Sequence, residues 1–165
     1  MAVNSLIVGA CVSFGIAWLG WNKLEKRAEK TSLRSESFSL LGPTITLVSE
    51  FRDMAENSLY ERSSTANISI SASDKLIKRQ GFDIKFHTKY QLLRVKLEQL
   101  KSRGIAIPED KLVDLRIAYT SSEINNIKSY SVALGASDRI EIELYAAFER
   151  AYPKRENWFS QQFPR

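Results

Sequence analysis

The chain has 165 residues, of which 44% are hydrophobic and 26% charged, and its formal net charge is +5. This length allows one membrane span plus one domain of ordinary size. Lysine and arginine are interleaved with glutamate and aspartate, so no basic face of the kind that binds nucleic acid is indicated, and we expect no nucleic-acid partner. Because Cys11 is the single cysteine, the chain cannot form an intramolecular disulfide.

The segment from Val3 to Trp21 is apolar and carries no charged side chain. As an α-helix it spans about 28 Å, close to the roughly 30 Å hydrocarbon core of a bilayer. It has neither the basic start nor the small-x-small end of a cleaved secretory signal. The segment therefore predicts a retained transmembrane helix, the alternative being a buried helix of a larger complex. The predicted anchor residues are Val3, Leu6, Ile7, Val8, Val12, Phe14, Ile16, Trp18, Leu19 and Trp21.

Positive charge follows this segment at once. Trp18 and Trp21 stand where an aromatic belt is expected at the membrane interface. No lysine or arginine precedes the span, so the positive-inside rule places the N-terminus outside and the large C-terminal part in the cytoplasm. The residues of this positive flank are Lys23, Lys26, Arg27 and Lys30.

Beyond Trp21 the sequence predicts helices. Residues 21–30 contain no glycine, proline or β-branched side chain, so we expect them to continue the span outward. The Gly42-Pro43 pair is expected to kink or interrupt this helix, and a new helix is expected to begin at Pro43. The apolar stripe of the new helix has spacings of three and four and includes Leu47, Phe51 and Met54.

The stretch from Ser63 to Phe86 leaves two alternatives open. Phe82, Ile84 and Phe86 alternate with charged residues, which is typical of a short strand, but the preceding residues have a helical composition. We favour a helix with a mobile interruption near Gly81. After it, apolar residues recur at intervals of four and three, which predicts a packed amphipathic helix with core residues Phe86, Tyr90, Leu93, Leu97 and Leu100.

This helix is predicted to end at Ser102-Arg103-Gly104, and Pro108 is predicted to open the next one. The apolar run of the helix that begins at Pro108 is followed by a second apolar run, which ends at Tyr152-Pro153, where the proline stops it. Gly135 is expected to mark a bend between these two runs. The short tail after Pro153 is aromatic. The core residues predicted along this part of the chain are Ile124, Ile127, Leu134, Leu144 and Phe148.

These elements predict an all-α protein, in which an N-terminal transmembrane helix is followed by an elongated antiparallel helical bundle. The expected divisions are the tail and span in residues 1–22, a juxtamembrane helix and linker in 23–42, the bundle in 43–153 and the aromatic tail in 154–165.

Residues that could carry chemistry are sparse. His87 is the single histidine and Cys11 the single cysteine, so neither a zinc site nor a Cys/His pair can be assembled. The glycines are scattered and form no phosphate-binding loop. Glu141 and Glu143 are two residues apart and do not share a helix face. We therefore expect no enzyme activity, no metal and no cofactor.

Several short motifs, in order along the chain, resemble those of the LemA family. Trp21-Asn22-Lys23-Leu24 is similar to its Tyr-Asn-x-Leu element after the span, and Gly42-Pro43 with the following residues is similar to its Ile-Pro-Asn-Leu-Val segment. The segment from Ser122 to Ala133 and the Phe148 to Pro153 segment resemble later family elements. The resemblance implies a bacterial inner-membrane protein with the N-terminus outside, a helical bundle inside, no settled enzymatic activity, and relatives in membrane organisation.

Three functions follow as hypotheses. The favoured one is a membrane-anchored, non-catalytic helical scaffold or interaction protein at the cytoplasmic face. The alternatives are an accessory subunit of a larger membrane complex, and a phage or envelope protein whose bundle lies outside the cytoplasm. The expected partners are membrane lipid and other proteins, with self-association left open.

Overall fold

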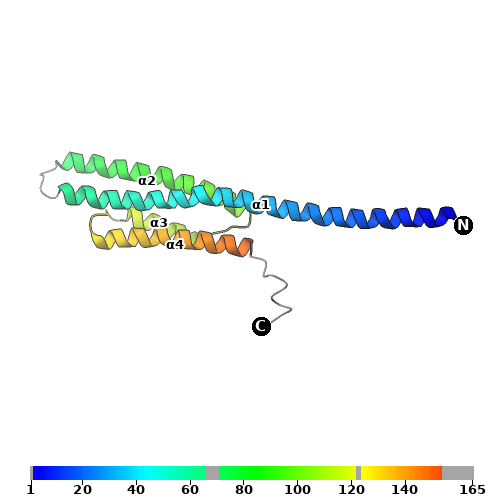
Figure 1. The fold of residues 1–165 in the computed structure, drawn as a ribbon. Helices are drawn as coiled ribbons and strands as arrows, with labels where there is room; N and C mark the ends of the chain where they lie inside the picture. Colours follow the sequence, from blue (N-terminus) through cyan, green and yellow to red (C-terminus); the bar gives the residue numbers. More distant parts are fainter. Residues whose placement is uncertain (1, 66–70, 122–123, 154–165) are drawn as a thin grey trace, which may run out of the picture. The chain divides into compact units, whose positions relative to one another are not determined.

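The computed structural model describes residues 2–65, 71–121 and 124–153, although nothing is described of the side chains of residues 2–16, 19 and 62–65. It confirms the predicted all-α class, since the described residues contain no strand. Figure 1 labels the four helices along the chain, and their bounds are α1 Ala2–Thr65, α2 Ala72–Lys101, α3 Glu109–Thr120 and α4 Ile127–Ala151.

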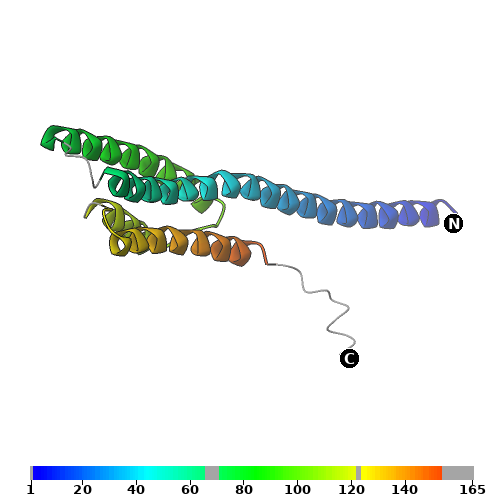
Figure 2. The ribbon, with the colours of Figure 1, turned by 60° about the vertical axis from the view of Figure 1, so that its left-hand side comes forward.

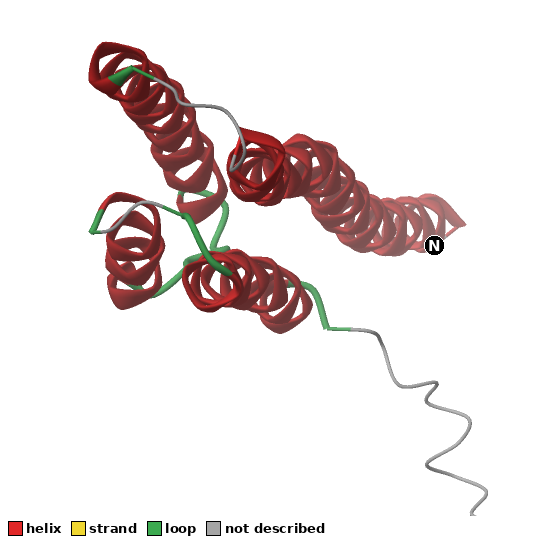
Figure 3. Cartoon of the chain, turned by 90° about the vertical axis from the view of Figure 1, so that its left-hand side faces the viewer, coloured by secondary structure: helices red, strands yellow, loops and turns green. Residues whose placement is uncertain are grey.

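The chain divides into two compact units, residues 1–38 and 39–165. In the second unit, the part of α1 after residue 38 and the other three helices form an antiparallel bundle, as predicted. The chain direction alternates from each helix to the next, and α1 and α2 run side by side in two views (Figures 1 and 2). Seen along the bundle, the four helices surround one interior (Figure 3).

Aromatic rings from three helices meet in the centre of this bundle. The Phe51 ring of α1 lies 5.5 Å from Phe86 of α2 and 5.7 Å from Tyr119 of α3, measured between ring centroids. The rings of Phe86 and Tyr119 stack at 5.2 Å with an interplanar angle of 8°. All three side chains are at most 1% exposed. This aromatic cluster of Phe51, Phe86 and Tyr119 therefore joins α1, α2 and α3.

Polar contacts connect α4 to the other helices. The buried hydroxyls of Tyr119 and Ser137 are 3.0 Å apart, and Ser137 also donates to the Ala133 carbonyl of its own helix. Arg52 of α1 pairs with Asp138 and Glu141 of α4. Each buried hydroxyl therefore has a partner, as the low dielectric of the interior requires.

Most of the residues predicted for the core lie in it. Met54 and Phe148 are half-buried against it, and Leu134 is half-buried. Ile127 contradicts the prediction, because it is 78% exposed at the first turn of α4. The buried members of the predicted set are Leu47, Phe51, Phe86, Tyr90, Leu93, Leu97, Leu100, Ile124 and Leu144.

The predicted interruption at Gly42-Pro43 is wrong, because α1 continues through both residues. Pro43 has no N–H to donate to the preceding turn. Hydroxyl groups make local bonds around it: Thr44 donates to the Leu40 carbonyl at 2.8 Å and Thr46 to the Gly42 carbonyl at 3.2 Å. Thr44 and Leu47 are buried in the bundle on the same helix, so tertiary packing holds this turn in helical form despite the proline.

The predicted interruption near Gly81 is also wrong, since α2 runs unbroken from Ala72 to Lys101. The helix begins further upstream, where the Ser71 hydroxyl caps it by accepting from the N–H of Ser73. Phe82 and Phe86 are one helical turn apart and face the core, whereas Ile84 faces outward. Their alternation is therefore part of a helix with two apolar faces. Residues 66–70 lie outside the described part of the chain.

The apolar pattern was expected to continue from α3 to a bend at Gly135, but α3 ends at Thr120, and α4 begins at Ile127 and continues through Gly135. Asn126 accepts from the N–H of Ser129 at 2.8 Å, and the Ser129 hydroxyl accepts from the N–H of Asn126 at 3.3 Å. This reciprocal capping box satisfies backbone groups that a helix start leaves open. The Asn-x-x-Ser pattern was the signal for this helix start.

The remaining helix ends agree with the prediction. The turn after Lys101 passes through Gly104, whose φ of +83° is a conformation that favours glycine. Pro108 precedes the first residue of α3, and α4 ends at Ala151 just before Pro153. The aromatic tail of residues 154–165 lies outside the described part of the chain.

We predict that Phe86→Ala lowers the free energy of unfolding by about 3–5 kcal/mol, because it removes one ring of the aromatic cluster and leaves a cavity. The matched control is Ile84→Ala, since Ile84 lies two residues away and is 67% exposed. We expect the control to change stability by at most about 0.5 kcal/mol. Urea unfolding followed by circular dichroism measures both, and equal effects would contradict the described core.

The stability of the bundle should fall at high pH. Burial raises the pKa of the Tyr119 phenol from 10.0 to about 12, while its hydrogen bond with Ser137 lowers the pKa in part. The unfolded chain therefore loses this proton near its usual pKa of about 10, and the folded bundle keeps it until about pH 12. The stabilisation that the neutral, buried Tyr119 phenol gives to the folded bundle is complete below pH 10 and is lost as the pH rises to 12.

Tyr119→Phe isolates this contribution from those of the other tyrosines. At pH 7 it should lower the free energy of unfolding by about 1 kcal/mol, the value of one hydrogen bond. Between pH 10 and 12 it should lose about 2–3 kcal/mol less than the parent protein does. Unfolding curves recorded across this pH range test the difference. Identical pH profiles for the two proteins would show that the phenol is not buried as described.

Candidate functional site

Among the described side chains, no group of three or more histidine, cysteine, aspartate or glutamate residues could hold a metal ion. His87 is exposed on α2. Glu141 forms an ion pair with Arg52. Exposed apolar and charged surfaces are prominent in the described part of the chain.

The predicted membrane anchor falls largely on residues whose side chains are not described. Trp18 and Trp21, which are described, are 61% and 70% exposed on α1. None of the helices is long and apolar enough to cross a membrane, judged on the described residues alone. The other predicted anchor residues lie outside the described side chains: Val3, Leu6, Ile7, Val8, Val12, Phe14, Ile16 and Leu19.

The segment of α1 that follows is exposed on every side. All residues from 20 to 36 are exposed, including the whole predicted positive flank. A helix with no packed face must obtain its stability from interactions between neighbouring side chains or from a partner. The flank residues that this segment places on the surface are Lys23, Lys26, Arg27 and Lys30.

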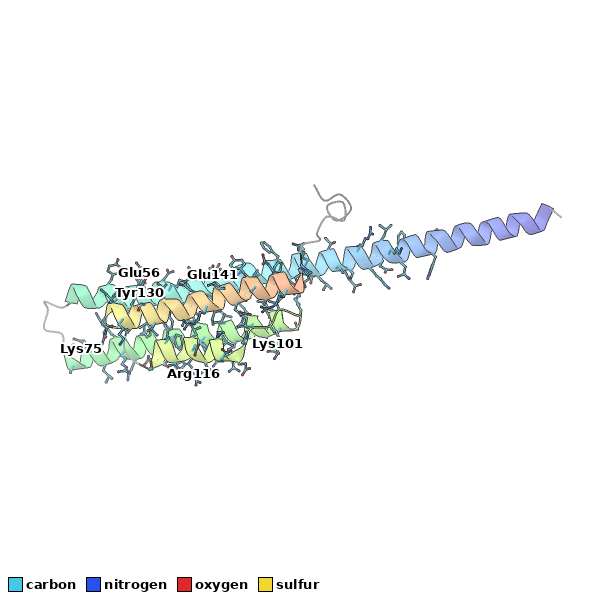
Figure 4. All side chains as sticks on the ribbon, turned by 90° about the horizontal axis from the view of Figure 1, so that it is seen from below. Glu56, Lys75, Lys101, Arg116, Tyr130 and Glu141 are labelled. Carbon is cyan, nitrogen blue, oxygen red and sulfur yellow. The ribbon has the colours of Figure 1, made fainter. Side chains whose placement is uncertain are left out.

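In the bundle, α2 has a second apolar face directed away from the core. At about 100° per residue, Ile77, Ile84 and Val95 fall within about 20° of one another, on the side opposite the buried residues. Leu92 lies at the edge of this stripe. In Figure 4, Lys75 and Lys101 mark the two ends of the helix that carries it. The exposed fractions of the stripe are Ile77 64%, Ile84 67%, Leu92 48% and Val95 56%.

Basic side chains border the outer stripe on the side toward α1. Lys85 and Lys96 fall within about 20° of each other on α2, about 100° from the centre of the stripe. Two further lysines on this border pair with glutamates of α1. The Lys78 ammonium lies 3.9 Å from the Glu61 carboxylate, and the Lys89 ammonium bonds to the Glu50 carboxylate. The opposite border carries charges of both signs. Asp74 also falls on this side of the stripe, so the border is predominantly positive.

A shallow groove of about 540 Å³ between α1 and α2 continues this surface. Leu92 belongs to both the stripe and the groove, so the two surfaces are contiguous. The groove offers the Pro43 ring and the side chain of Thr46, with one acidic and one basic lining residue, Glu50 and Lys96. Together they provide an apolar strip with polar edges, the composition expected where another helix docks.

Sequence reasoning missed the outer stripe. It assigned α2 one apolar face and treated the rest of the helix as charged. The signal was present, because Ile77 and Ile84 are seven residues apart and Val95 follows after eleven, both near-integral numbers of helical turns. The alternation of Ile84 with two phenylalanines obscured it by suggesting a strand.

Comparison with known proteins gives no match to a family model, to a curated protein or to a solved structure. The resemblance to the LemA family therefore remains a prediction from short motifs in the sequence. The surfaces of this chain are what a functional proposal can rest on.

Proposed function

We propose that this protein is a membrane-anchored, non-catalytic helical interaction module that docks a partner protein on the outer face of α2. The observation that carries the proposal is the exposed apolar stripe of α2, which consists of Ile77, Ile84, Leu92 and Val95. The opposite face of the same helix is already buried in the core. Isolated apolar residues on a surface need no explanation, but four on one helix face form a contact surface.

The shape and charge of this surface favour a particular kind of partner. A stripe along one helix, continued by a shallow groove, suits an amphipathic helix laid alongside it. The lysine border, which includes Lys85 and Lys96, favours a partner helix whose apolar face is flanked by glutamate or aspartate. We therefore propose an acidic amphipathic helix as the docked element.

The anchoring part of the proposal rests on composition. The uncharged apolar segment from Val3 to Trp21 is long enough to cross a bilayer, and the cationic flank that follows favours a cytoplasmic position for the bundle. The LemA-like motifs favour a bacterial inner membrane with the N-terminus outside. Tethering would confine docking to partners at the membrane and raise their effective concentration.

Substitutions on the outer stripe test the docking role. Ile84→Asp should weaken partner binding by about tenfold or more, because it removes apolar contact and puts a negative charge opposite acidic flanks. Ile84→Lys removes the same contact with the opposite charge and should weaken binding less. The control is Ile142→Asp, since Ile142 is 66% exposed on α4 and lies outside the stripe.

Partner recovery from solubilised membranes, quantified beside the melting temperature of each variant, measures these effects. All three variants should melt within a few degrees of the parent protein, because both positions are exposed. Equal losses of binding for Ile84→Asp and Ile142→Asp would refute a docking site on α2.

Anchoring is tested by extraction. The full chain should stay in the membrane pellet under alkaline conditions, which release peripheral proteins, whereas a variant that lacks residues 1–22 should move to the supernatant. Release of the full chain by alkali would refute a transmembrane anchor, even if the basic flank binds lipid headgroups.

A permanent subunit of a larger membrane complex is the second candidate. The same observation favours it, since α2 is apolar on two faces and so carries more apolar surface than one bundle needs. A permanent partner should remain bound at constant stoichiometry through purification, and the protein without it should aggregate. A docking module should stay soluble when the partner is removed.

A further inference from the structure

Seven of the eight charged side chains on α1 between Lys23 and Glu36 are separated onto two faces of the helix, and Lys26 lies between these faces. At about 100° per residue, the basic face is an arc of about 60° and the acidic face an arc of about 40°, centred about 150° away. All these residues are exposed. The basic face consists of Lys23, Arg27, Lys30 and Arg34, and the acidic face consists of Glu25, Glu29 and Glu36.

This arrangement disfavours the helix when it stands alone. An exposed helix gains stability when opposite charges are four residues apart and loses it when like charges are. Here Lys23 precedes Arg27 and Glu25 precedes Glu29 at this spacing. Lys26 with Lys30 and Lys30 with Arg34 repeat the unfavourable pattern. Residues 20–36 bury no apolar face in the described structure. The opposite-charge pair Lys26 and Glu29, three residues apart, and the hydrogen bond from Ser32 to Glu36 offset only part of this repulsion.

We propose that this segment associates laterally with a second copy of the chain, the basic face of one helix lying against the acidic face of the next. Consider two parallel copies whose helices are not shifted along their axes. Each glutamate of one copy then lies within about 3 Å, measured along the helix axis, of a basic residue on the other copy, since a helix rises about 1.5 Å per residue. The pairing places opposite charges of the two copies next to each other. Attraction between the copies then opposes the repulsion between like charges within each helix.

The geometry of the two faces determines the kind of assembly. Because one face binds the other, the contact is heterologous, and each added copy leaves one basic and one acidic face unused. The association therefore extends to rows or closes into rings, and does not stop at a symmetric dimer. The attraction depends on charges alone and holds whether or not the protein is anchored in a membrane.

An anionic membrane surface is the competing partner for the basic face. It accounts for one face only, because anionic lipid would repel the three glutamates on the other. The basic face also extends about 16 Å along the helix, which is twice the Debye length of about 8 Å at physiological ionic strength. Lipid attraction therefore explains Lys23 better than it explains Arg34.

Charge reversal with complementation tests the proposal on the full chain in uncharged detergent micelles, with energy transfer between labelled copies as the readout. One variant carries Lys23→Glu, Arg27→Glu, Lys30→Glu and Arg34→Glu, and the other carries Glu25→Lys, Glu29→Lys and Glu36→Lys. Each variant alone should not associate, because both of its faces have the same sign. A mixture of the two should associate at least as well as the parent protein.

A composition-matched variant separates association from helix stability. Arg27→Glu with Glu29→Arg keeps the net charge but places one wrong charge on each face. It should weaken association at least tenfold while raising helix content, because Lys23 then precedes a glutamate and Glu25 an arginine at a spacing of four. Association of the parent should also weaken about tenfold between about 0.05 and about 0.5 M salt as the Debye length shrinks.

Three results would overturn the proposal. The first is association of the composition-matched variant equal to that of the parent. The second is a mixture of the two reversed variants that does not associate. The third is a parent chain that stays monomeric in micelles but binds phosphatidylserine vesicles through its basic face, which would assign that face to lipid. If alkali releases the full chain from the membrane, the proposed anchor is refuted, but the association expected in micelles does not change.

Discussion

The stacked rings of Phe86 and Tyr119, with Phe51 against both, are the contact on which the bundle depends. They bring together three helices, and the Tyr119 hydroxyl extends the contact to Ser137 of the fourth. Once these inward faces are occupied, the remaining side of α2 must face outward. The exposed stripe is therefore a consequence of a core that is complete without it, which is why we interpret it as a binding surface.

The sequence predicted most of this core, because spacings of three and four place Phe86, Tyr90 and Leu93 on one face of any helix. It did not predict where the helices are continuous. Proline and glycine disfavour a helix locally, but tertiary packing can hold the helix together. At Pro43 the burial of Thr44 and Leu47 in the bundle favours the continuous helix. The break before α4 depends instead on one reciprocal cap between Asn126 and Ser129, a signal weaker than a glycine but supported by two hydrogen bonds from backbone N–H groups to side-chain oxygens.

The candidate surfaces were only partly predictable. The basic flank was read from the sequence as a topology signal, which required no more than counting lysines and arginines. Its separation from the glutamates, and the second apolar face of α2, emerge only when one continuous helix is assigned, because a side chain's direction depends on every residue between it and its neighbours. In both places the chain carries surface chemistry beyond the needs of its own fold.

Photocrosslinking in intact cells would test most directly whether a tethered bundle docks a partner through α2. A crosslinking amino acid at position 84 samples the outer stripe, and one at position 142 samples α4, where the native isoleucine is equally exposed. The account predicts one discrete crosslinked partner at 84 and none at 142, with the signal at 84 reduced when residues 1–22 are absent. Equal crosslinking at both positions, or a signal at 84 unaffected by that deletion, would contradict it.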